Sequence, residues 1–171
     1  MTHHPGRGIT LIELIVVVSI LAILAGALVP RVTNHMAESR DARRLADVKT
    51  LAALIERFHA DHGRYPESRP DTSFGGWDVS SQGSFLHELV ERGYLRASLR
   101  DPLDDSQHYY AYYRYEKGTA GCVGDGPFYV LGVKAFETAA ATERHRGGFR
   151  CAERDWSREM AYVSGGGTAQ P

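Results

Sequence analysis

The sequence lacks the short motifs that usually mark an enzyme or a nucleotide-binding protein. It has no G-x-S-x-G elbow and no H-E-x-x-H helix, so it offers no recognisable nucleophile or zinc-binding helix. The turn Gly124–Gly126 lacks the third glycine, the lysine and the following helix that a phosphate loop needs. We therefore expect that the protein is not an enzyme and has no catalytic residues.

An excess of charge of one sign is also missing. The 20 basic and 21 acidic residues give a net charge of −1, and no long run of like charge occurs. Proteins that bind nucleic acid usually carry a basic patch or stripe. A nucleic-acid partner is therefore not expected.

Cysteine is scarce. The chain has two cysteines, Cys122 and Cys151, both far from the N-terminus. An even count suits one disulfide in an exported domain, and two buried free thiols are the alternative. If the two cysteines pair, the domain folds in an oxidising compartment.

One long apolar stretch dominates the N-terminal part of the sequence. Residues Ile9–Val29 number 21 and are apolar except for Thr10, Glu13 and Ser19. As a helix they would cover about 31 Å, which is enough to cross the core of a bilayer. This stretch therefore predicts a membrane span. A carboxylate such as Glu13 is costly inside hydrocarbon, so we expect it to have a function.

The residues around this acid resemble the start of type IV pilins and of type II secretion pseudopilins. The match is the string G-I-T-L-I-E, which begins at Gly8, and Pro30 closes the apolar run. The resemblance implies that a prepilin peptidase cleaves after Gly8 and N-methylates the new first residue, Ile9. It also implies that Glu13 serves filament assembly by pairing with the amino terminus of an adjacent subunit. An uncleaved signal anchor is the alternative.

A second helical stretch follows the span. Its apolar residues recur at spacings of three and four and share one broad face; they are Leu45, Val48, Leu51, Ala52, Ile55 and Phe58. Pro30 cannot donate a backbone hydrogen bond and Gly26 weakens a helix, so we predict one long helix with a kink or local melting at these two residues. Gly63 and a following proline end it. The charged residues of this stretch are expected to form an ordinary solvated face; among them are Arg40, Asp41, Arg43 and Arg44.

Two places in the sequence raise the question of a metal site. His59 and His62 lie three apart near the end of the helix, but without a clear third ligand they are typical of surface residues, so no metal is predicted there. The resemblance also suggests a calcium site, because major pseudopilins hold calcium in a loop near their C-terminal strands. That loop is not recognisable in this sequence, and Asp104 and Asp105 are ordinary turn residues. We predict no cofactor, with calcium as the alternative.

Three further strings resemble major pseudopilins: G-R-Y-P from Gly63, G-Y-L from Gly93 and D-P from Asp101. Between them, Ser84–Gly93 has the capping residue, apolar pattern and terminal glycine of a short helix. Two aromatic and β-branched runs, His108–Tyr115 and Pro127–Phe136, predict strands, the first with Tyr109, Ala111, Tyr113 and Tyr115 on one face.

These features predict an α+β pilin fold, in which a long kinked N-terminal helix, with its inner half transmembrane, packs against a small antiparallel β-sheet. Beyond the leader and span about 140 residues remain, enough for one domain. The expected parts are a cleaved leader over 1–8, a transmembrane and filament-core helix over 9–29, its amphipathic outer half over 30–62, a globular β domain over 63–163 and a flexible tail over 164–171.

The resemblance implies a structural subunit of a pilus-like filament. The Val29-Pro30 junction and the three strings favour a type II secretion pseudopilin that drives protein export. A type IV pilin is the alternative, and the cysteine pair favours it. A single-span, membrane-anchored binding domain that never polymerises is an alternative of another class, against which Glu13 argues.

The implied partners are copies of the same chain and related subunits, the prepilin peptidase, an inner-membrane assembly platform with its ATPase, and membrane lipid. Arginines are more numerous after the span than before it, where Arg7 stands alone, so the positive-inside rule alone would place the C-terminal domain in the cytoplasm. The opposite orientation, with this domain in the periplasm, comes from the resemblance.

Overall fold

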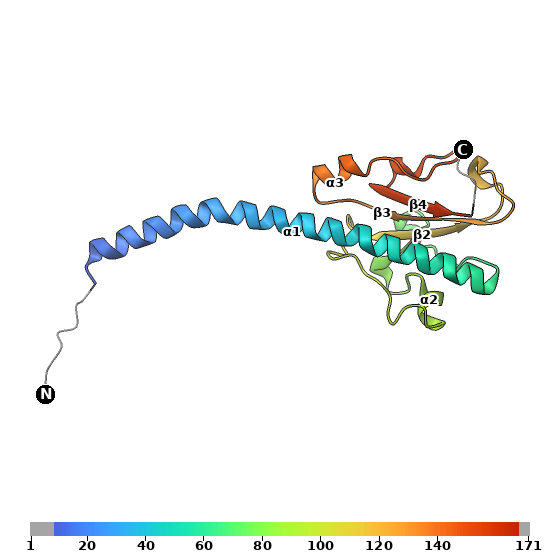
Figure 1. Ribbon diagram of the computed structural model, residues 1–171, viewed down its shortest axis with the longest axis horizontal. Helices are drawn as coiled ribbons and strands as arrows, with labels where there is room; N and C mark the ends of the chain where they lie inside the picture. Colours follow the sequence, from blue (N-terminus) through green and yellow to red (C-terminus); the bar gives the residue numbers. More distant parts are fainter. Residues whose placement is uncertain (1–8, 168–171) are drawn as a thin grey trace, which may run out of the picture. The chain divides into compact units, whose positions relative to one another are not determined.

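The computed structural model describes residues 9–167 of the chain. The chain divides into two compact units, of which the first ends at Ala37 and the second begins at Glu38. The helix α1, Leu11–His62, contributes to both units. Together with a four-stranded antiparallel sheet, this helix confirms the predicted α+β class and pilin-like fold (Figure 1).

In the described residues, the first unit consists of the N-terminal part of α1 up to Ala37, most of which is apolar. By length and composition α1 is the one candidate membrane span in the described part of the chain, and none of its apolar window is buried within the structure. The helical backbone runs without a break through Gly26 and residue 30. The chain therefore does not unwind at these positions, and the predicted kink stays a prediction.

The second unit is built on an antiparallel sheet whose strands follow the order β1-β2-β3-β4. The strands are β1 (Asp78–Val79), β2 (Tyr110–Tyr115), β3 (Phe128–Val133) and β4 (Tyr162–Gly166). The two longest strands are those that the sequence predicts. In register, Tyr110 lies opposite Val133 and Tyr115 opposite Phe128.

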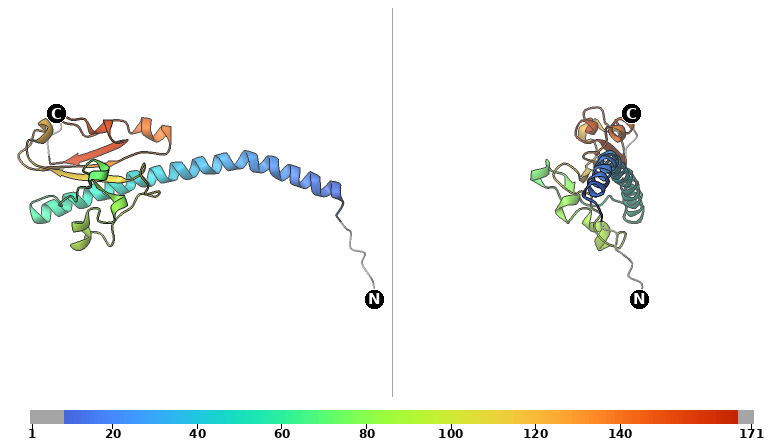
Figure 2. Two further views of the ribbon diagram at one scale, coloured as in Figure 1. Left: turned by 180° about the vertical axis from the view of Figure 1, so that it is seen from behind. Right: turned by 90° about the vertical axis from the view of Figure 1, so that its left-hand side faces the viewer.

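Two hydrophobic cores lie on opposite faces of this sheet, because side chains alternate along a strand. The first core holds Tyr110 and Tyr112 of β2 against the apolar face of α1, which includes the buried residues Val48, Leu51, Ile55 and Phe58. Figures 1 and 2 show this part of α1 running along one face of the sheet. The second core holds Ala111 and Tyr115 with the C-terminal loops. Both predicted faces, that of the helix and that of the strand, are confirmed.

Short elements fill the connections. They are α2 (His87–Glu91), α3 (Ala139–Arg144) and four 3-10 turns, η1 (Thr72–Phe74), η2 (Ser80–Gln82), η3 (Thr119–Gly121) and η4 (Trp156–Arg158). The predicted short helix over 84–93 is thus found as α2. As the sequence predicts, Gly63 terminates α1: the helix ends at His62, and Gly63 follows with a φ of 69° and donates its N–H to the carbonyl of His59 at 2.8 Å.

The G-R-Y-P turn fastens the end of α1 to the rest of the domain. Arg64 donates two hydrogen bonds to the carboxylate of Glu88 on α2, at 2.9 and 2.7 Å. The hydroxyl of Tyr112 donates to the carbonyl of Pro66 at 2.8 Å. These hydrogen bonds anchor the turn that follows α1 to α2 and to β2.

Two expectations are wrong. The charged surface of α1 is not uniformly solvated, because Arg44 and Asp41 are buried. The flexible tail does not begin at 164, because Ser164 pairs with Leu131 in the ladder between β4 and β3. β4 continues to Gly166, and residues 168–171 lie outside the described residues.

Candidate functional site

The N-terminal end of α1 is organised by a hydrogen-bonded pair. The carboxylate of Glu13 accepts from the backbone N–H of Thr10 at 2.9 Å and from its hydroxyl at 2.9 Å. In return, the N–H of Glu13 donates to the threonine hydroxyl at 3.3 Å. A threonine followed three residues later by glutamate forms a capping box, which satisfies free N–H groups at the start of a helix.

This local role of Glu13 was missed from the sequence, although the T-x-x-E spacing is readable there. Both hydrogen bonds from Thr10 reach the same oxygen, Oε2. Within the described residues, Oε1 has no hydrogen-bond partner. The acid can therefore cap its own helix and still receive a further donor from outside the chain.

The surroundings of Glu13 are apolar and open. Ile9 is 79% exposed and Ile12 is 71% exposed. Further large apolar side chains are at least half exposed along the same helix: Leu11, Leu14, Ile15, Val16, Val17, Val18, Ile20, Leu21, Ile23, Leu24 and Leu28. An apolar surface of this length is unfavourable in water, so it requires lipid or the apolar surfaces of other helices.

The other predicted N-terminal site residues have few contacts of their own. An ideal Cβ placed on Gly26 would meet nothing within 4 Å, so packing inside this chain does not demand a glycine there. Gly8 and the leader over 1–8 lie outside the described residues. Cleavage after Gly8 and methylation of Ile9 therefore stay predictions.

The network around Arg44 is a second charged centre, in the globular unit. Its guanidinium, which is fully buried, donates to Asp101 at 2.7 and 2.8 Å, to Asp41 at 2.8 Å and to Glu137 at 2.8 Å. The hydrogen bond from Arg40 is the main reason why the pKa of Glu137 falls to about 2, since it outweighs the opposing effect of burial. This network ties α1 to two distant loops.

Asp41 extends the network to the start of α3. Its carboxylate accepts from the N–H of Glu137 at 3.0 Å, and from the N–H and hydroxyl of Thr138 at 2.9 and 2.8 Å. Thr138 is in turn the N-cap of α3. Buried charges are tolerated when they are paired and hydrogen-bonded, so this centre has a structural role.

Cys122 and Cys151, which the sequence suggests as a pair, are joined by a disulfide in the structure. They are 29 positions apart in the sequence, and both belong to the second core. The bond fastens the turn after η3 to the segment before η4. It therefore closes the C-terminal loop over the face of the sheet that α1 does not cover.

The histidines near the end of α1 do not converge on one point. His59 stacks on Tyr65 with ring centroids 4.3 Å apart, and His62 stacks on Phe58 at 4.3 Å. Asp61 accepts from the hydroxyl of Tyr94 at 2.5 Å. Among residues 9–167, no cluster of three or more acidic, histidine or cysteine side chains is arranged to hold a metal. The absence of a cofactor, with calcium as the alternative, therefore stays a prediction.

Comparison with known proteins connects this geometry to a family. The model of the prokaryotic N-terminal methylation motif matches residues 5–29. The chain is 37% identical over 69 residues to the type II secretion system core protein G of Pseudomonas aeruginosa, covering 40% of this chain and 49% of that protein. It is 30% identical over 105 residues to the core protein G of Klebsiella michiganensis, covering 60% of this chain and 71% of that protein.

Pilins are similar as well. The chain is 24% identical over 94 residues to the type IV major pilin protein PilE1 of Neisseria gonorrhoeae, covering 54% of this chain and 52% of the pilin. The chain thus spans about half the length of the Neisseria and Pseudomonas relatives. No solved structure gives a match. The chain has the methylation motif at its N-terminal end and a helix packed on an antiparallel sheet in its C-terminal part, and it covers 71% of a core protein G at 30% identity. The chain therefore belongs to the superfamily of type IV pilins and type II secretion pseudopilins.

Proposed function

We propose that the protein is a pseudopilin of a type II secretion system, which polymerises from the inner membrane to drive protein export. The observation that carries the proposal is the apolar, exposed N-terminal half of α1 with Glu13 as its acid. The same surface suits lipid before assembly and neighbouring helices afterwards. The likeness to core protein G supports the secretion branch.

The capping box suggests how Glu13 would contact an adjacent subunit during polymerisation. After cleavage, Ile9 would carry the free amino group, one residue before Thr10. The carboxylate of Glu13 holds Thr10 through Oε2, and Oε1 would receive the amino group of an adjacent subunit. In a low-dielectric helix bundle each charge offsets part of the desolvation of the other.

The remaining parts of the proposal concern location and partners. The C-terminal domain, with its disulfide, would fold in the oxidising periplasm. Processing would be by the prepilin peptidase, and extraction from lipid by an assembly platform with its ATPase. The role of the chain itself is structural and not catalytic.

Two other functions remain as candidates. A type IV pilin is favoured by the disulfide that closes the C-terminal loop and by the likeness to the gonococcal pilin. A membrane-anchored binding domain would use the same span without polymerising. In such a protein the acid would serve only as the capping partner of Thr10, and its charge would have no partner within the membrane.

A deletion with paired readouts tests the proposal. Cells that lack the gene should lose secretion of their type II substrates and keep any surface pili, and the wild-type gene should restore secretion. Loss of pili with normal secretion would identify a type IV pilin instead. Overproduction with the rest of the apparatus should yield filaments that contain this chain. Monomeric membrane protein in every preparation would contradict a filament role.

A further inference from the structure

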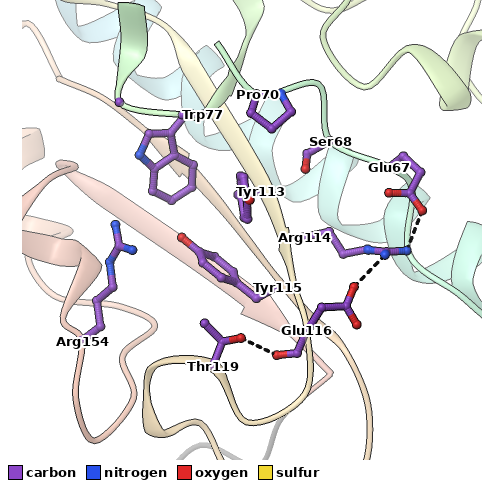
Figure 3. Close-up of a pocket in the computed structure, with 12 residues that line it drawn as sticks. Glu67, Ser68, Pro70, Trp77, Tyr113, Arg114, Tyr115, Glu116, Thr119 and Arg154 are labelled. Atoms are coloured by element: carbon purple, nitrogen blue, oxygen red, sulfur yellow. Dashed lines mark hydrogen bonds and ion pairs between the residues drawn. The ribbon is translucent and has the colours of Figure 1, made fainter. Parts of the chain in front are cut away.

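The connection between β2 and β3 is held at its start and free at its end. In the first part, the hydroxyl of Thr119 donates to the carbonyl of Glu116 at 2.8 Å (Figure 3), and the N–H of Cys122 donates to the carbonyl of Thr119 at 3.1 Å. In the second part, residues 123–126 make no hydrogen bond to any other described residue, and Val123 is 71% exposed. The loop between the disulfide and β3 therefore lies open to water.

Asp125 lies in this free part and is followed by a glycine. Its side chain is fully exposed, and the Nζ atom of Lys117 is 4.0 Å from its Oδ1. That separation is too long for a hydrogen bond, so the carboxylate is free to turn toward the backbone. The N–H of Gly126 has no hydrogen-bond partner among the residues that the structure describes, and an ideal Cβ on Gly126 would meet nothing within 4 Å. The carboxyl carbon of Asp125 and the next backbone nitrogen can therefore approach each other.

Three other aspartates in loops are held in place. The carboxylates of Asp71, Asp105 and Asp155 each accept from the N–H two residues further on, at 2.7, 2.8 and 3.0 Å. This bond forms an Asx turn, which fixes the orientation of the carboxylate. None of the three is followed by glycine. They are therefore controls for Asp125 within the same chain.

We propose that Asp125 is a site of spontaneous isomerisation to isoaspartate. The backbone nitrogen of Gly126 attacks Cγ of Asp125; the nitrogen gives up its proton and the carboxyl group gives up its hydroxyl, so one water leaves and a five-membered succinimide forms. Water then adds to one of the two ring carbonyls. Addition at Cγ restores aspartate, whereas addition at the main-chain carbonyl leaves the chain running through Cγ, which is isoaspartate. Glycine favours ring closure because it has no side chain beside the attacking nitrogen and permits many backbone conformations.

Isomerisation changes the loop and leaves its two ends in place. It adds one backbone atom between Asp125 and Gly126. The loop is fixed at one end by the disulfide at Cys122 and at the other by the ladder, in which Phe128 lies opposite Tyr115. Because residues 123–126 have no hydrogen bonds to lose among the described residues, isoaspartate should accumulate in the folded protein and distinguish old subunits from new ones. This inference does not depend on filament assembly.

Peptide mapping of the purified full chain in detergent micelles tests the proposal. After incubation at neutral pH, reduction and alkylation, trypsin should release residues 118–134, because it cleaves after Lys117 and Lys134 and no lysine or arginine lies between them. A second peptide of identical mass should grow with incubation time, beside a small amount of succinimide that is lighter by one water. Electron-transfer fragmentation should place isoaspartate at position 125. The three aspartates in Asx turns should stay unchanged.

Two variants and a synthetic peptide serve as controls. Asp125→Glu keeps the charge but would have to close a six-membered ring, so it should give no second peptide. Gly126→Ala, for which the structure has open space, should slow the appearance of the second peptide several-fold. A synthetic peptide of residues 118–134 gives the rate for the unfolded sequence. A folded chain that stays unmodified while this peptide isomerises would overturn the proposal, and so would an equal second peptide from Asp125→Glu.

Discussion

Replacement of Glu13 by glutamine separates its two roles at the start of α1. In the structure the side chain caps its own helix through Thr10, and we propose that it also pairs with a neighbouring amino terminus. Glutamine serves in a capping box as glutamate does, but it carries no charge. Glu13→Gln therefore removes the charge and keeps the cap, whereas Glu13→Leu removes both.

The two roles differ in expected size. Loss of a cap lowers helix stability by roughly a factor of five in the equilibrium constant. Loss of one member of a buried ion pair leaves the other charge unpaired, and weakens each subunit contact by on the order of a hundredfold or more. Glu13→Gln and Glu13→Leu should therefore both abolish filaments, while Thr10→Ala, which weakens only the cap, should reduce them modestly.

Three measurements on each variant are needed. Membrane fractionation should show normal insertion, and intact mass should show normal removal of residues 1–8. Electron microscopy of filaments and an assay of secreted protein then report assembly. Filaments of wild-type number and length from Glu13→Gln, combined with none from Glu13→Leu, would show that the cap matters and the charge does not.

Four other outcomes follow from the sequence and the structure. Mature protein should begin at Ile9 by N-terminal sequencing, and retention of the leader in cells with an active prepilin peptidase would contradict the pilin assignment. Burial raises the pKa of Asp78 to about 6, so the folded state should lose stability as the pH rises from about 4 through about 6 and this carboxyl ionises. In denaturant titrations, the Asp78→Asn variant should therefore be more stable than the wild type by up to about 3 kcal/mol at pH 8, and should differ little from it at pH 4. Arg44→Met should destabilise by about 3–5 kcal/mol, because it leaves buried carboxylates unpaired, and wild-type thermal stability would refute this role. Replacing Cys122 and Cys151 by serine should cost about 3–4 kcal/mol, and without reductant neither wild-type cysteine should react with an alkylating agent.

The sequence predicts those parts of the fold that depend on local pattern. The apolar spacing from Val48 to Phe58 places one face of α1 in the core, and Gly63 ends the helix. The aromatic strands are found where their composition puts them. In each case neighbouring residues carry the information, because helix and strand periods are read over a few positions.

The elements that were missed depend on distant partners. β4 contains Ser-Gly-Gly, which has low strand propensity, and it is a strand because β3 supplies the ladder. Arg44 lies among charged neighbours that suggest a solvated surface, yet its partners Asp101 and Glu137 are 57 and 93 positions away in the sequence. No window around Arg44 contains those acids, so its burial could not be predicted.

The polar residues of the apolar stretch show why one acid would suffice to set the register of a filament. Ser19 donates to the carbonyl of Ile15 at 2.8 Å, and Thr10 is engaged with Glu13. Both hydroxyls are thus satisfied within their own helix. The aliphatic side chains are chemically alike, so sliding one helix along another would exchange similar contacts at little cost. The only ionisable side chain between Ile9 and Pro30 is that of Glu13, and pairing it with an amino terminus permits one register. If Glu13 pairs as we propose, a charge at that position would select a single arrangement among many apolar ones, in the way that one buried polar residue fixes the register of a coiled coil.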